Sequence, residues 1–495
     1  MKNKKMISVF KNGIVRYLSL AVLGGISSYS FAPYGFWPIL VLSLAWLLFC
    51  LNSAVSKKQA FGLSFVFGFF LGGVSTHWLI NALMIDGGRF IYYAPVVFIG
   101  MGILFGLFFA LPAVLAYYAP HGIKRVFAYS ALMVIFEWVR SWLLSGFPWN
   151  LTGAVWTDFP AIVQTASVLG VYGLSLITFL LAGSIALLPK KAPVIGMCIL
   201  MVLLYGAGSL RLYTAQNDMV LGIRLRLVQP NIPQTLKWKP GRAEENFKTL
   251  ISLSKENNDG ITHVIWPESA VPFLIDDPAQ RPRLMSAVRQ GATLITGALR
   301  IADYDTRDLA NSIFILDDLA GVVGFYDKSH LVPFGEYVPE WLPFKKLVPF
   351  ESSFIPGKGI KTNPIPKAPP AGLLVCYEII FSGQVVDAKN RPQWLINATN
   401  DAWYGISSGP YQHLGMTQMR AVEEGLPVVR ATNNGISAII DPYGRITKWL
   451  GLGEKGVVDG ALPVSLSPTL YALFGPTIVL LLSVFILIFS FRRQK

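Results

Sequence analysis

The chain has 495 residues, of which 53% are hydrophobic and only 14% are charged, and its mean hydropathy is +0.50. Soluble domains carry about 25% charged residues, so this composition excludes a disordered chain, a coiled coil and an ordinary cytosolic protein. The 42 Lys and Arg exceed the 28 Asp and Glu, which gives a net charge of +14. No nucleic-acid-binding motif accompanies this excess, so it indicates anionic lipid or membrane topology rather than nucleic acid.

Long apolar stretches predict a polytopic α-helical membrane protein. A stretch of about 20 apolar residues can cross a bilayer as a helix. Seven candidates precede residue 212 and an eighth lies near the C-terminus, at residues 13–32, 36–52, 60–83, 92–118, 124–145, 160–188, 193–211 and 467–491. The first has no clear signal-peptidase site and leads into further spans, so we expect it to be retained. About eight transmembrane helices are therefore predicted, seven in residues 1–212 and one in residues 466–495.

Positive charges in the short loops predict the orientation of these spans. Lys and Arg gather in alternate loops, at positions 2, 4 and 5, 57 and 58, 124 and 125, 190 and 191, and 492, 493 and 495. With eight spans all of these positions lie on one side, which the positive-inside rule makes cytoplasmic. Both termini would then be cytoplasmic and the segment between spans seven and eight periplasmic. Miscounting two spans preserves this orientation, whereas an odd error breaks it.

Residues 222–465 differ in composition from the chain before them. Charged residues, Pro and Asn appear, and the apolar runs shorten to the length of strands. We predict strands at 223–229, 263–267, 293–299, 311–317, 321–327, 371–376, 394–399, 427–432 and 436–441, and helices near 243–256, 280–290, 380–389 and 411–425. This alternation predicts one α/β domain, large enough to bury its own core. The stretch 339–370, rich in Pro, Lys and aromatic residues, is predicted to be a long loop.

Cys376 is the first candidate for chemistry, since it is the only cysteine outside the predicted spans. It ends the apolar strand 371–375 and directly precedes a predicted helix. A nucleophile at such a turn is exposed and faces a helix N-terminus, which lowers the pKa of a thiol and supplies N–H donors. The alternative is a buried, inert cysteine, the usual state of a free Cys.

Two further candidates also follow predicted strands. Glu268 comes directly after Trp266 and Pro267, an environment that can raise the pKa of a carboxyl group and suit it to act as a general base. Lys328 can place a positive charge on a developing oxyanion, and Glu336 would suit a partner that orients it. The alternatives are a solvated acid at a strand end and a surface lysine.

Polar residues inside the predicted spans also need partners. Glu137 and Arg140 are three apart and can pair on one helix face, and His77 and Asn81 are four apart. We favour structural pairing over contact with lipid headgroups for both sets. The five histidines are scattered, so a structural metal is not expected. Three cysteines are too few for a disulfide framework. The sequence also gives no support for a dissociable cofactor.

The order of these residues, Glu268, then Lys328, then Cys376-Tyr377-Glu378, resembles the carbon–nitrogen hydrolase (nitrilase) superfamily. Three runs strengthen the match: Trp266-Pro267-Glu268, residues 328–337, and Asn400-Asp401-Ala402-Trp403-Tyr404-Gly405. Together with the membrane spans, the chain resembles the apolipoprotein N-acyltransferase family over essentially its whole length. Residues 231–234 with Lys237-Trp238, and Phe147-Pro148-Trp149, also fit that family.

The resemblance implies a nitrilase-like αββα sandwich in residues 222–465 and an enzyme of the bacterial inner membrane. The family transfers a fatty acyl chain from a phospholipid, typically phosphatidylethanolamine, to the α-amino group of the N-terminal S-diacylglyceryl-cysteine of apolipoproteins. This is the last step of lipoprotein maturation. Carried over, Cys376 is the nucleophile that forms a thioester, Glu268 the general base and Lys328 the oxyanion stabiliser in a ping-pong reaction.

Further assignments follow from the same resemblance. The backbone N–H of Tyr377 would assist Lys328 at the oxyanion, Glu336 and Glu378 would orient the reactive groups, and Trp238 would contact lipid. The loop 339–370, with Trp341 and Phe344, suits a lid or lipid-entry gate at the bilayer surface.

Two other functions remain open from the residues alone. A membrane-tethered amidase would use the same three residues with water as the acceptor, although the membrane body and the need to protect a thioester favour acyl transfer. A transporter with an extracytoplasmic sensor domain would leave the three reactive residues unexplained. Replacement of Cys376 by Ala separates the transporter, which should tolerate it, from either enzyme.

Overall fold

The structure, a computed structural model, describes the chain except residues 1–12, 86, 240, 339–353 and 493–495. It divides into two compact units. The helical unit comprises the residues up to Ile80, Ile91–Thr214 and the stretch from Leu470 onward. The sheet unit comprises Asn81–Phe90 and Ala215–Thr469.

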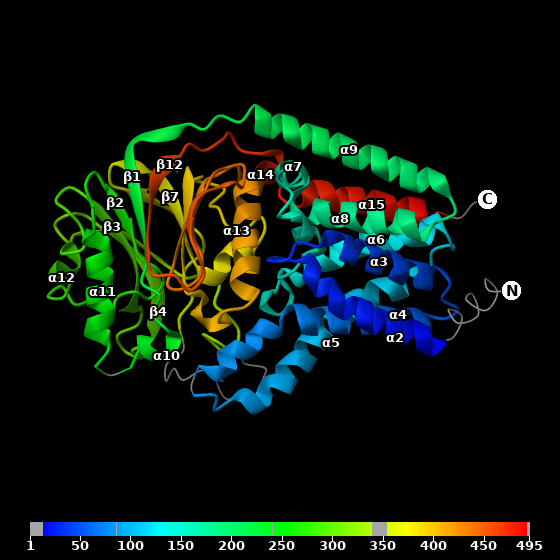
Figure 1. The fold of residues 1–495 in the computed structure, drawn as a ribbon, viewed down its shortest axis with the longest axis horizontal. Helices are drawn as coiled ribbons and strands as arrows, with labels where there is room; N and C mark the ends of the chain where they lie inside the picture. Colours follow the sequence, from blue (N-terminus) through cyan, green and yellow to red (C-terminus); the bar gives the residue numbers. More distant parts are fainter. Residues whose placement is uncertain (1–12, 86, 240, 339–353, 493–495) are drawn as a thin grey trace. The chain divides into compact units, whose positions relative to one another are not determined.

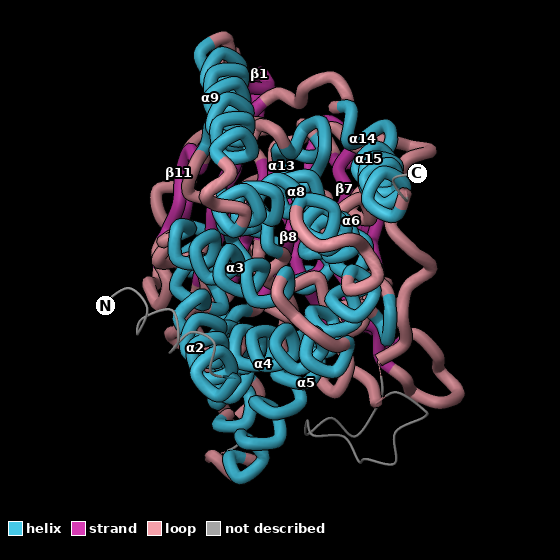
Figure 2. Tube along the Cα trace, turned by 90° about the vertical axis from the view of Figure 1, so that its right-hand side faces the viewer, coloured by secondary structure: helices cyan, strands magenta, loops and turns pink. Residues whose placement is uncertain are grey.

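The helical unit is built from long apolar helices, drawn in cyan in Figure 2. They are α2 (Gly13–Ile26), α3 (Trp37–Asn52), α4 (Lys57–Ser75), α5 (Ala94–Ala116), α6 (Ile123–Arg140), α8 (Ala166–Ala186), α9 (Lys191–Tyr213) and α15 (Thr477–Phe491), with short α7 (Pro160–Val163) and α14 (Leu470–Phe474). Within the described residues, three helices are long and apolar enough to cross a membrane: Ile91–Ala116, Ala166–Ala186 and Lys191–Tyr213. A fourth is added if Lys57–Ser75 and His77–Met84, bent by 42°, form one span. A count of about eight therefore stays a prediction.

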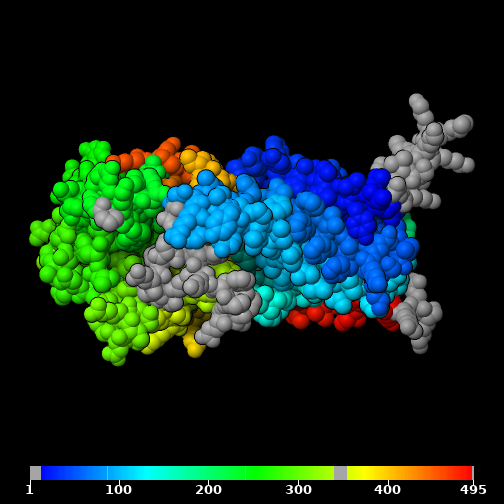
Figure 3. Space-filling view, turned by 90° about the horizontal axis from the view of Figure 1, so that it is seen from below, coloured from blue at the N-terminus to red at the C-terminus, as the bar shows by residue number. Residues whose placement is uncertain are grey.

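Glycines let the helices of this unit approach closely. A Cβ atom at Gly68 of α4 would lie 2.8 Å from Phe105 O and 2.9 Å from Phe109 Cβ of α5. The same Cβ position lies 3.1 Å from the Gly106 Cα atom, and small residues at such a contact let two helix backbones approach closely enough for tight van der Waals packing. Figure 3 shows these N-terminal helices, in blue, as one continuous surface.

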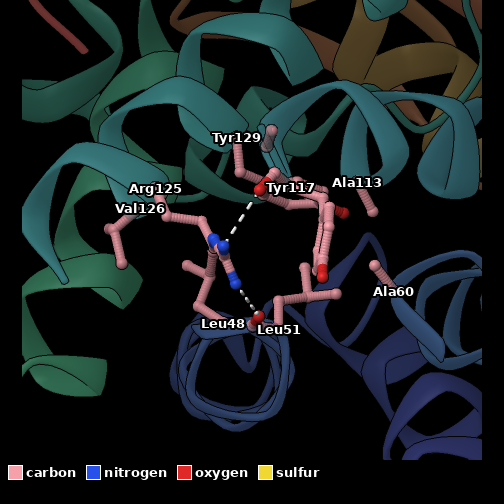
Figure 4. Close-up of a pocket in the computed structure, with 9 residues that line it drawn as sticks. Leu48, Leu51, Ala60, Ala113, Tyr117, Arg125, Val126 and Tyr129 are labelled. Atoms are coloured by element: carbon pink, nitrogen blue, oxygen red, sulfur yellow. Dashed lines mark hydrogen bonds between the residues drawn. The ribbon is translucent and has the colours of Figure 1, made fainter. Parts of the chain in front are cut away.

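Buried polar groups in the helical unit find main-chain partners. Figure 4 shows the Arg125 side chain pointing into a small pocket between helices, where it donates hydrogen bonds to Leu51 O (3.3 Å) and Tyr117 O (2.9 Å). These carbonyl groups lie at the ends of α3 and α5, where the last carbonyls of a helix lack their usual helical partners, although Leu51 O also accepts from Ala54 N at 3.1 Å. The guanidinium therefore fulfils a capping role that joins two helix ends.

Glu137 and Arg140, predicted to pair on α6, both bond to the main chain that follows this helix. Glu137 Oε1 accepts a hydrogen bond from Thr152 N (2.8 Å), and Arg140 Nη1 donates one to Trp149 O (3.1 Å). The Arg140 guanidinium also lies 4.3 Å from the centroid of the Phe105 ring. Both residues are buried, and they shape the turn after α6.

His77 and Asn81, which were predicted to pair, each bond to a different main-chain oxygen. His77 Nδ1 lies 2.8 Å from Val74 O, within its own chain segment. Asn81 belongs to the sheet unit, where its side chain donates to Tyr404 O at 2.6 Å. Asn81 is therefore a structural residue that anchors the loop after β8.

The sheet unit contains two six-stranded sheets. The first has the order β12-β1-β2-β3-β4-β5, with β1 (Met219–Gln229), β2 (His263–Ile265), β3 (Thr293–Ile301), β4 (Leu309–Leu316), β5 (Val322–Asp327) and β12 (Gly456–Pro463). The second has the order β11-β10-β9-β8-β7-β6, with β6 (Thr362–Ile365), β7 (Ala368–Val375), β8 (Trp394–Thr399), β9 (Val428–Thr432), β10 (Ser437–Ile440) and β11 (Ile446–Leu450). In each sheet the central strands β1–β2–β3 or β7–β8–β9 are parallel.

The two sheets pack face to face with helices outside them, which makes an αββα sandwich. Apolar side chains of both sheets form one shared core, including Leu227 and Ile295 from the first and Leu373 and Ile396 from the second. On the outer face of the first sheet lie α11 (Ala243–Lys255) and α12 (Arg281–Met285), and α13 (Gly409–Glu424) lies against the second (Figure 1). Because both faces of the central strands are covered, those strands read as continuous apolar runs.

The nine strands predicted from the sequence are all present, but three more were missed. Strands β6 and β11 are edge strands. Strand β6 and the start of β7 lie in the stretch 339–370 that was predicted as a loop. Pro residues in this stretch argue against a strand, but an edge strand tolerates them. The remainder of that prediction, residues 339–353, lies outside the described residues.

Two helix predictions need correction. The helix predicted at 380–389 is absent from these described residues, which form turns after a 3₁₀ turn at Cys376–Ile380. Gly383, with φ +75°, takes a left-handed conformation that interrupts a right-handed helix. The helix predicted at 280–290 is limited to α12.

The close packing of α4 against α5 yields a first prediction. Gly68→Val should destabilise the helical unit by about 1–3 kcal/mol, because the added carbons overlap the main chain of α5. Thermal unfolding in detergent measures the effect. Gly100→Val, on α5 with no atom within 4 Å of its Cβ position, is the matched control and should unfold like wild type. Equal unfolding of the two variants would contradict the packing argument.

Candidate active site

The three sequence-predicted reactive residues meet in one buried site of the sheet unit. Glu268 follows β2 and Lys328 follows β5 of the first sheet, whereas Cys376 follows β7 of the second. Lys328 Nζ lies 3.8 Å from Glu268 Oε1, and both side chains act electrostatically on the Cys376 thiol. Their exposed fractions are 7% for Glu268, 1% for Lys328 and 5% for Cys376. The face-to-face packing of the sheets thus brings Cys376 together with Glu268, which lies 108 positions earlier in the chain.

Lys328 is held by a second carboxylate, as expected for Glu336. Its Nζ donates to Glu336 Oε1 at 2.8 Å, and Glu336 Oε2 accepts from Val332 N at 2.8 Å. Burial by itself lowers the pKa of Lys328, but the attraction of Glu336 and Glu268 outweighs burial and raises the pKa above its usual value. Lys328 is therefore a permanent positive charge in the site.

Glu268 has one bonded oxygen and one free oxygen. Asn311 Nδ2 donates to its Oε1 at 2.7 Å, whereas Oε2 is buried without a hydrogen-bond partner among the described residues. Burial raises the pKa of this carboxyl group, and Lys328 opposes that rise. A carboxylate with a raised pKa and a free oxygen is suited to accept a proton.

Cys376 starts the 3₁₀ turn after β7 with φ +50°, a left-handed conformation that costs a non-glycine residue about 1–3 kcal/mol. The prediction of an exposed thiol with a lowered pKa is wrong, because the thiol is buried and a short 3₁₀ turn replaces the predicted helix. Burial raises the thiol pKa to about 12, Glu268 adds to the rise and Lys328 opposes it. The resting thiol is therefore protonated and needs a base.

Glu378 joins the two sides of the site. Its carboxylate accepts hydrogen bonds from Val375 N (2.7 Å), Ser329 N (2.7 Å) and His330 N (3.0 Å). It thereby ties the end of β7 to the segment that follows Lys328. The orienting role that the family resemblance implies for Glu378 stays a prediction.

Two more predicted site residues lie beside the three. The buried Tyr377 ring packs against Phe381, with centroids 5.1 Å apart, so its side chain is part of the packing under the turn. Trp238 is 41% exposed and lines a small surface pocket together with Lys237. A half-exposed indole is compatible with the predicted contact with an apolar ligand.

Sequence reasoning missed Lys237 and Asn311 as members of the site. Lys237 Nζ is buried and donates to the main-chain oxygen of Glu268 at 2.9 Å. Burial lowers its pKa to about 8, although Glu268 and Cys376 attract its charge. Lys237 stood in a run quoted for the family resemblance, but nothing in its sequence pattern signalled burial. Asn311 lies inside β4, where a polar residue in an apolar run was the only available signal.

Comparison with known families agrees with this architecture. Residues 224–469 match the carbon-nitrogen hydrolase family, and residues 23–184 match the apolipoprotein N-acyltransferase N-terminal domain. The sheet unit and its site thus define a nitrilase-like, carbon–nitrogen hydrolase type of enzyme.

Full-length relatives specify the family further. The apolipoprotein N-acyltransferase of Rhodopseudomonas palustris is 35% identical over 100% of this chain and 99% of its own, and that of Rickettsia prowazekii is 37% identical over 95% and 97%. The chain belongs to the apolipoprotein N-acyltransferase family and is an acyltransferase. A solved amidase from Nesterenkonia sp. is 19% identical over 50% of this chain and 94% of its own, with a TM-score of 0.36, so the assignment rests on the family models and the relatives.

A glycine beneath Glu268 yields the second prediction. A Cβ atom at Gly297 of β3 would lie 2.4 Å from Pro267 O and 2.6 Å from the Glu268 Cα atom. Gly297→Ala should displace Glu268 and reduce acyl transfer at least tenfold, since an angstrom of misplacement is costly in catalysis. Turnover measured on folded protein tests this. Gly324→Ala, with its nearest atoms at 3.5 and 3.6 Å, should retain activity, and equal activity of both variants would contradict the prediction.

Proposed function

We propose that this protein transfers a fatty acyl chain from a phospholipid to the α-amino group of the N-terminal S-diacylglyceryl-cysteine of apolipoproteins, the last step of lipoprotein maturation. The observation that carries the proposal is the buried convergence of Glu268, Lys328 and Cys376 in a chain that aligns over its whole length with apolipoprotein N-acyltransferases. The donor we propose is phosphatidylethanolamine, through its sn-1 chain.

In the first half-reaction, Cys376 is the nucleophile. The free oxygen of Glu268 accepts the thiol proton, and the thiolate attacks the ester carbonyl of the lipid. The Lys328 ammonium, with the Tyr377 N–H, stabilises the oxyanion that develops. When the ester bond breaks, the leaving alkoxide takes the proton from Glu268, so a lysophospholipid departs and a thioester stays on Cys376.

In the second half-reaction, the lipoprotein amine attacks the thioester. Glu268 accepts a proton from the attacking amine and returns it to the departing Cys376 sulfur, which leaves an amide on the lipoprotein. Lys328 again faces the oxyanion. The low exposure of the three side chains favours transfer over hydrolysis, because water is kept from the thioester until the amine arrives.

For the membrane arrangement, we propose seven spans in residues 1–212, a periplasmic catalytic domain in residues 222–465 and an eighth span with a cytoplasmic tail in residues 466–495. Both termini would be cytoplasmic in the bacterial inner membrane. The apolar helices and the positive charges of alternate loops support this arrangement. Trp238, at the edge of the site, is proposed to contact lipid. The predicted gate for lipid entry in residues 339–370 is proposed only for the part that precedes β6.

The acyl-enzyme gives the direct test of the proposed function. Incubation with phosphatidylethanolamine and no acceptor should add one fatty-acyl mass to the intact protein, and hydroxylamine should remove it. Cys376→Ala should abolish the increment, whereas the matched Cys198→Ala should keep it, because Cys198 lies in α9 of the helical unit. If lipid binds and no increment forms in wild type, phospholipid is not the acyl donor and the amidase alternative gains.

Lys237 yields a prediction on pH dependence. Glu268 must be ionised to accept the thiol proton, so acylation should rise with pH as this carboxyl group loses its proton. Lys237→Met removes a cation that lowers the pKa of Glu268, so this acid limb should move to higher pH. Single-turnover acylation from pH 4 to 8 measures the limb, with Lys237→Arg as the charge-retaining control. A limb that stays in place in Lys237→Met would contradict the prediction.

A further inference from the structure

A second buried charged cluster lies behind Cys376, and the mechanism does not use it. It consists of Asp401 after β8, His413 on α13 and Arg430 on β9, each fully buried. Arg430 Nη2 donates to Asp401 Oδ2 at 2.6 Å, and His413 Nδ1 lies 2.8 Å from Asp401 Oδ1. Asp401 belongs to the run 400–405, which carried part of the family resemblance, but it is not one of the three residues with a proposed chemical role.

Hydrogen bonds connect this cluster to the main chain of the nucleophile. Arg430 Nη1 donates to Asn397 Oδ1, so the amide nitrogen of Asn397 must face the other way. That nitrogen donates to Cys376 O at 3.2 Å and to Leu374 O at 3.3 Å. The orientation of the Asn397 amide, and with it the bond to Cys376, is thus fixed by Arg430.

Two further contacts act on Cys376 from the same cluster. The side chain of Thr399 acts to lower the pKa of the Cys376 thiol, and its Oγ1 donates to Asp401 Oδ1 at 3.4 Å. The His413 ring also interacts with the Cys376 main chain. The Cys376 carbonyl is therefore bonded by Asn397, and the Cys376 thiol is influenced by Thr399. Asn397 is bonded in turn to Arg430, and Thr399 to Asp401.

The Asp401–Arg430 ion pair points to a role in geometry rather than in proton transfer. Burial alone raises the pKa of Asp401, but Arg430 and His413 outweigh it and lower the pKa to about 2. Burial and the neighbouring Arg430 lower the pKa of His413. At neutral pH the low pKa of Asp401 keeps its carboxylate ionised beside the Arg430 guanidinium, and the lowered pKa of His413 favours the neutral imidazole.

The packing around this pair leaves no freedom. A Cβ atom at Gly435 would lie 2.3 Å from Asp401 Oδ2. Buried ion pairs can often be replaced by apolar residues without loss of stability, so burial of this pair is weak evidence for a purely stabilising role. Through Asn397 and Thr399, this pair is linked to Cys376, whose backbone has the strained left-handed conformation at φ +50°.

We propose that the Asp401–Arg430–His413 cluster is a positioning device for the nucleophile, which holds Cys376 in its left-handed conformation through Asn397 and Thr399 and aims the thiol at Glu268 and Lys328. These are positioning residues, since they act through Cys376. The inference rests on the proposed role of Cys376 as nucleophile.

Arg430→Met tests the proposal against a matched control. Arg226→Met removes an equally buried arginine that pairs with Asp459 at 2.6 Å in the first sheet and donates to the end of α11. Both variants should lower the thermal stability. Only Arg430→Met should slow acylation of Cys376 by phosphatidylethanolamine, by tenfold or more in kcat with KM changed less than twofold. Arg430→Lys, which keeps the charge, should recover part of the rate.

A second variant and a lipid-free readout complete the test. Asn397→Leu keeps the Asp401–Arg430 pair but removes the amide that accepts from Arg430 and donates to Leu374 O and Cys376 O. This variant decides the question if Arg430→Met does not fold. Alkylation of Cys376 by iodoacetamide should slow in the same variants, because it depends on the position of the thiol and not on lipid. Acylation and alkylation equal to those of Arg226→Met, per folded molecule, would overturn the inference. Wild type that is alkylated but never acylated by the phospholipid would instead overturn the proposed function.

Discussion

The buried positive charge of Lys328 is the interaction on which the rest of the site depends. Its ammonium, 1% exposed, faces Glu336 at 2.8 Å and Glu268 at 3.8 Å. Removing one partner of a buried ion pair costs about 3–5 kcal/mol, because the remaining charge has lost both water and its partner. Without Lys328, two carboxylates would share a dry pocket and at least one would hold a proton. The base and the oxyanion stabiliser are therefore one electrostatic system rather than two separate groups.

The αββα sandwich places the charged side chains that follow strands of one sheet beside the sulfur that follows a strand of the other sheet. Glu268 and Lys328 end strands of the first sheet, and Cys376 ends a strand of the second. Apolar packing between the sheets is non-directional and would tolerate small slips. The hydrogen bonds of Glu378, from the end of β7 to the chain after Lys328, supply the directional link that fixes the two halves in register.

The sequence was informative where polar residues interrupt local apolar runs, and silent where the environment comes from distant chain segments. Glu268, Lys328 and Cys376 each follow an apolar strand, so their meeting could be predicted. Lys237 and Asp401 could not be singled out, since their burial depends on segments that pair only in the folded sandwich. The same limit explains the thiol: its position directly after a strand was predicted correctly, but the predicted helix after it is absent, and the burial that raises its pKa leaves no local pattern. Edge strands β6 and β11 escaped because Pro residues and exposure blur their alternation.

Burial of Cys376 looks unfavourable for a nucleophile, because it raises the thiol pKa to about 12. The same burial raises the pKa of Glu268, the group that must take the proton. Moving the proton from sulfur to carboxylate shifts a negative charge within the dry site without creating one, so much of the desolvation cost cancels between the two groups. A solvated base with an ordinary pKa would be a weaker acceptor for this thiol. Burial of the pair together therefore allows a thioester to form in a place from which water is excluded, which is the condition for handing the acyl chain to an amine instead of to water.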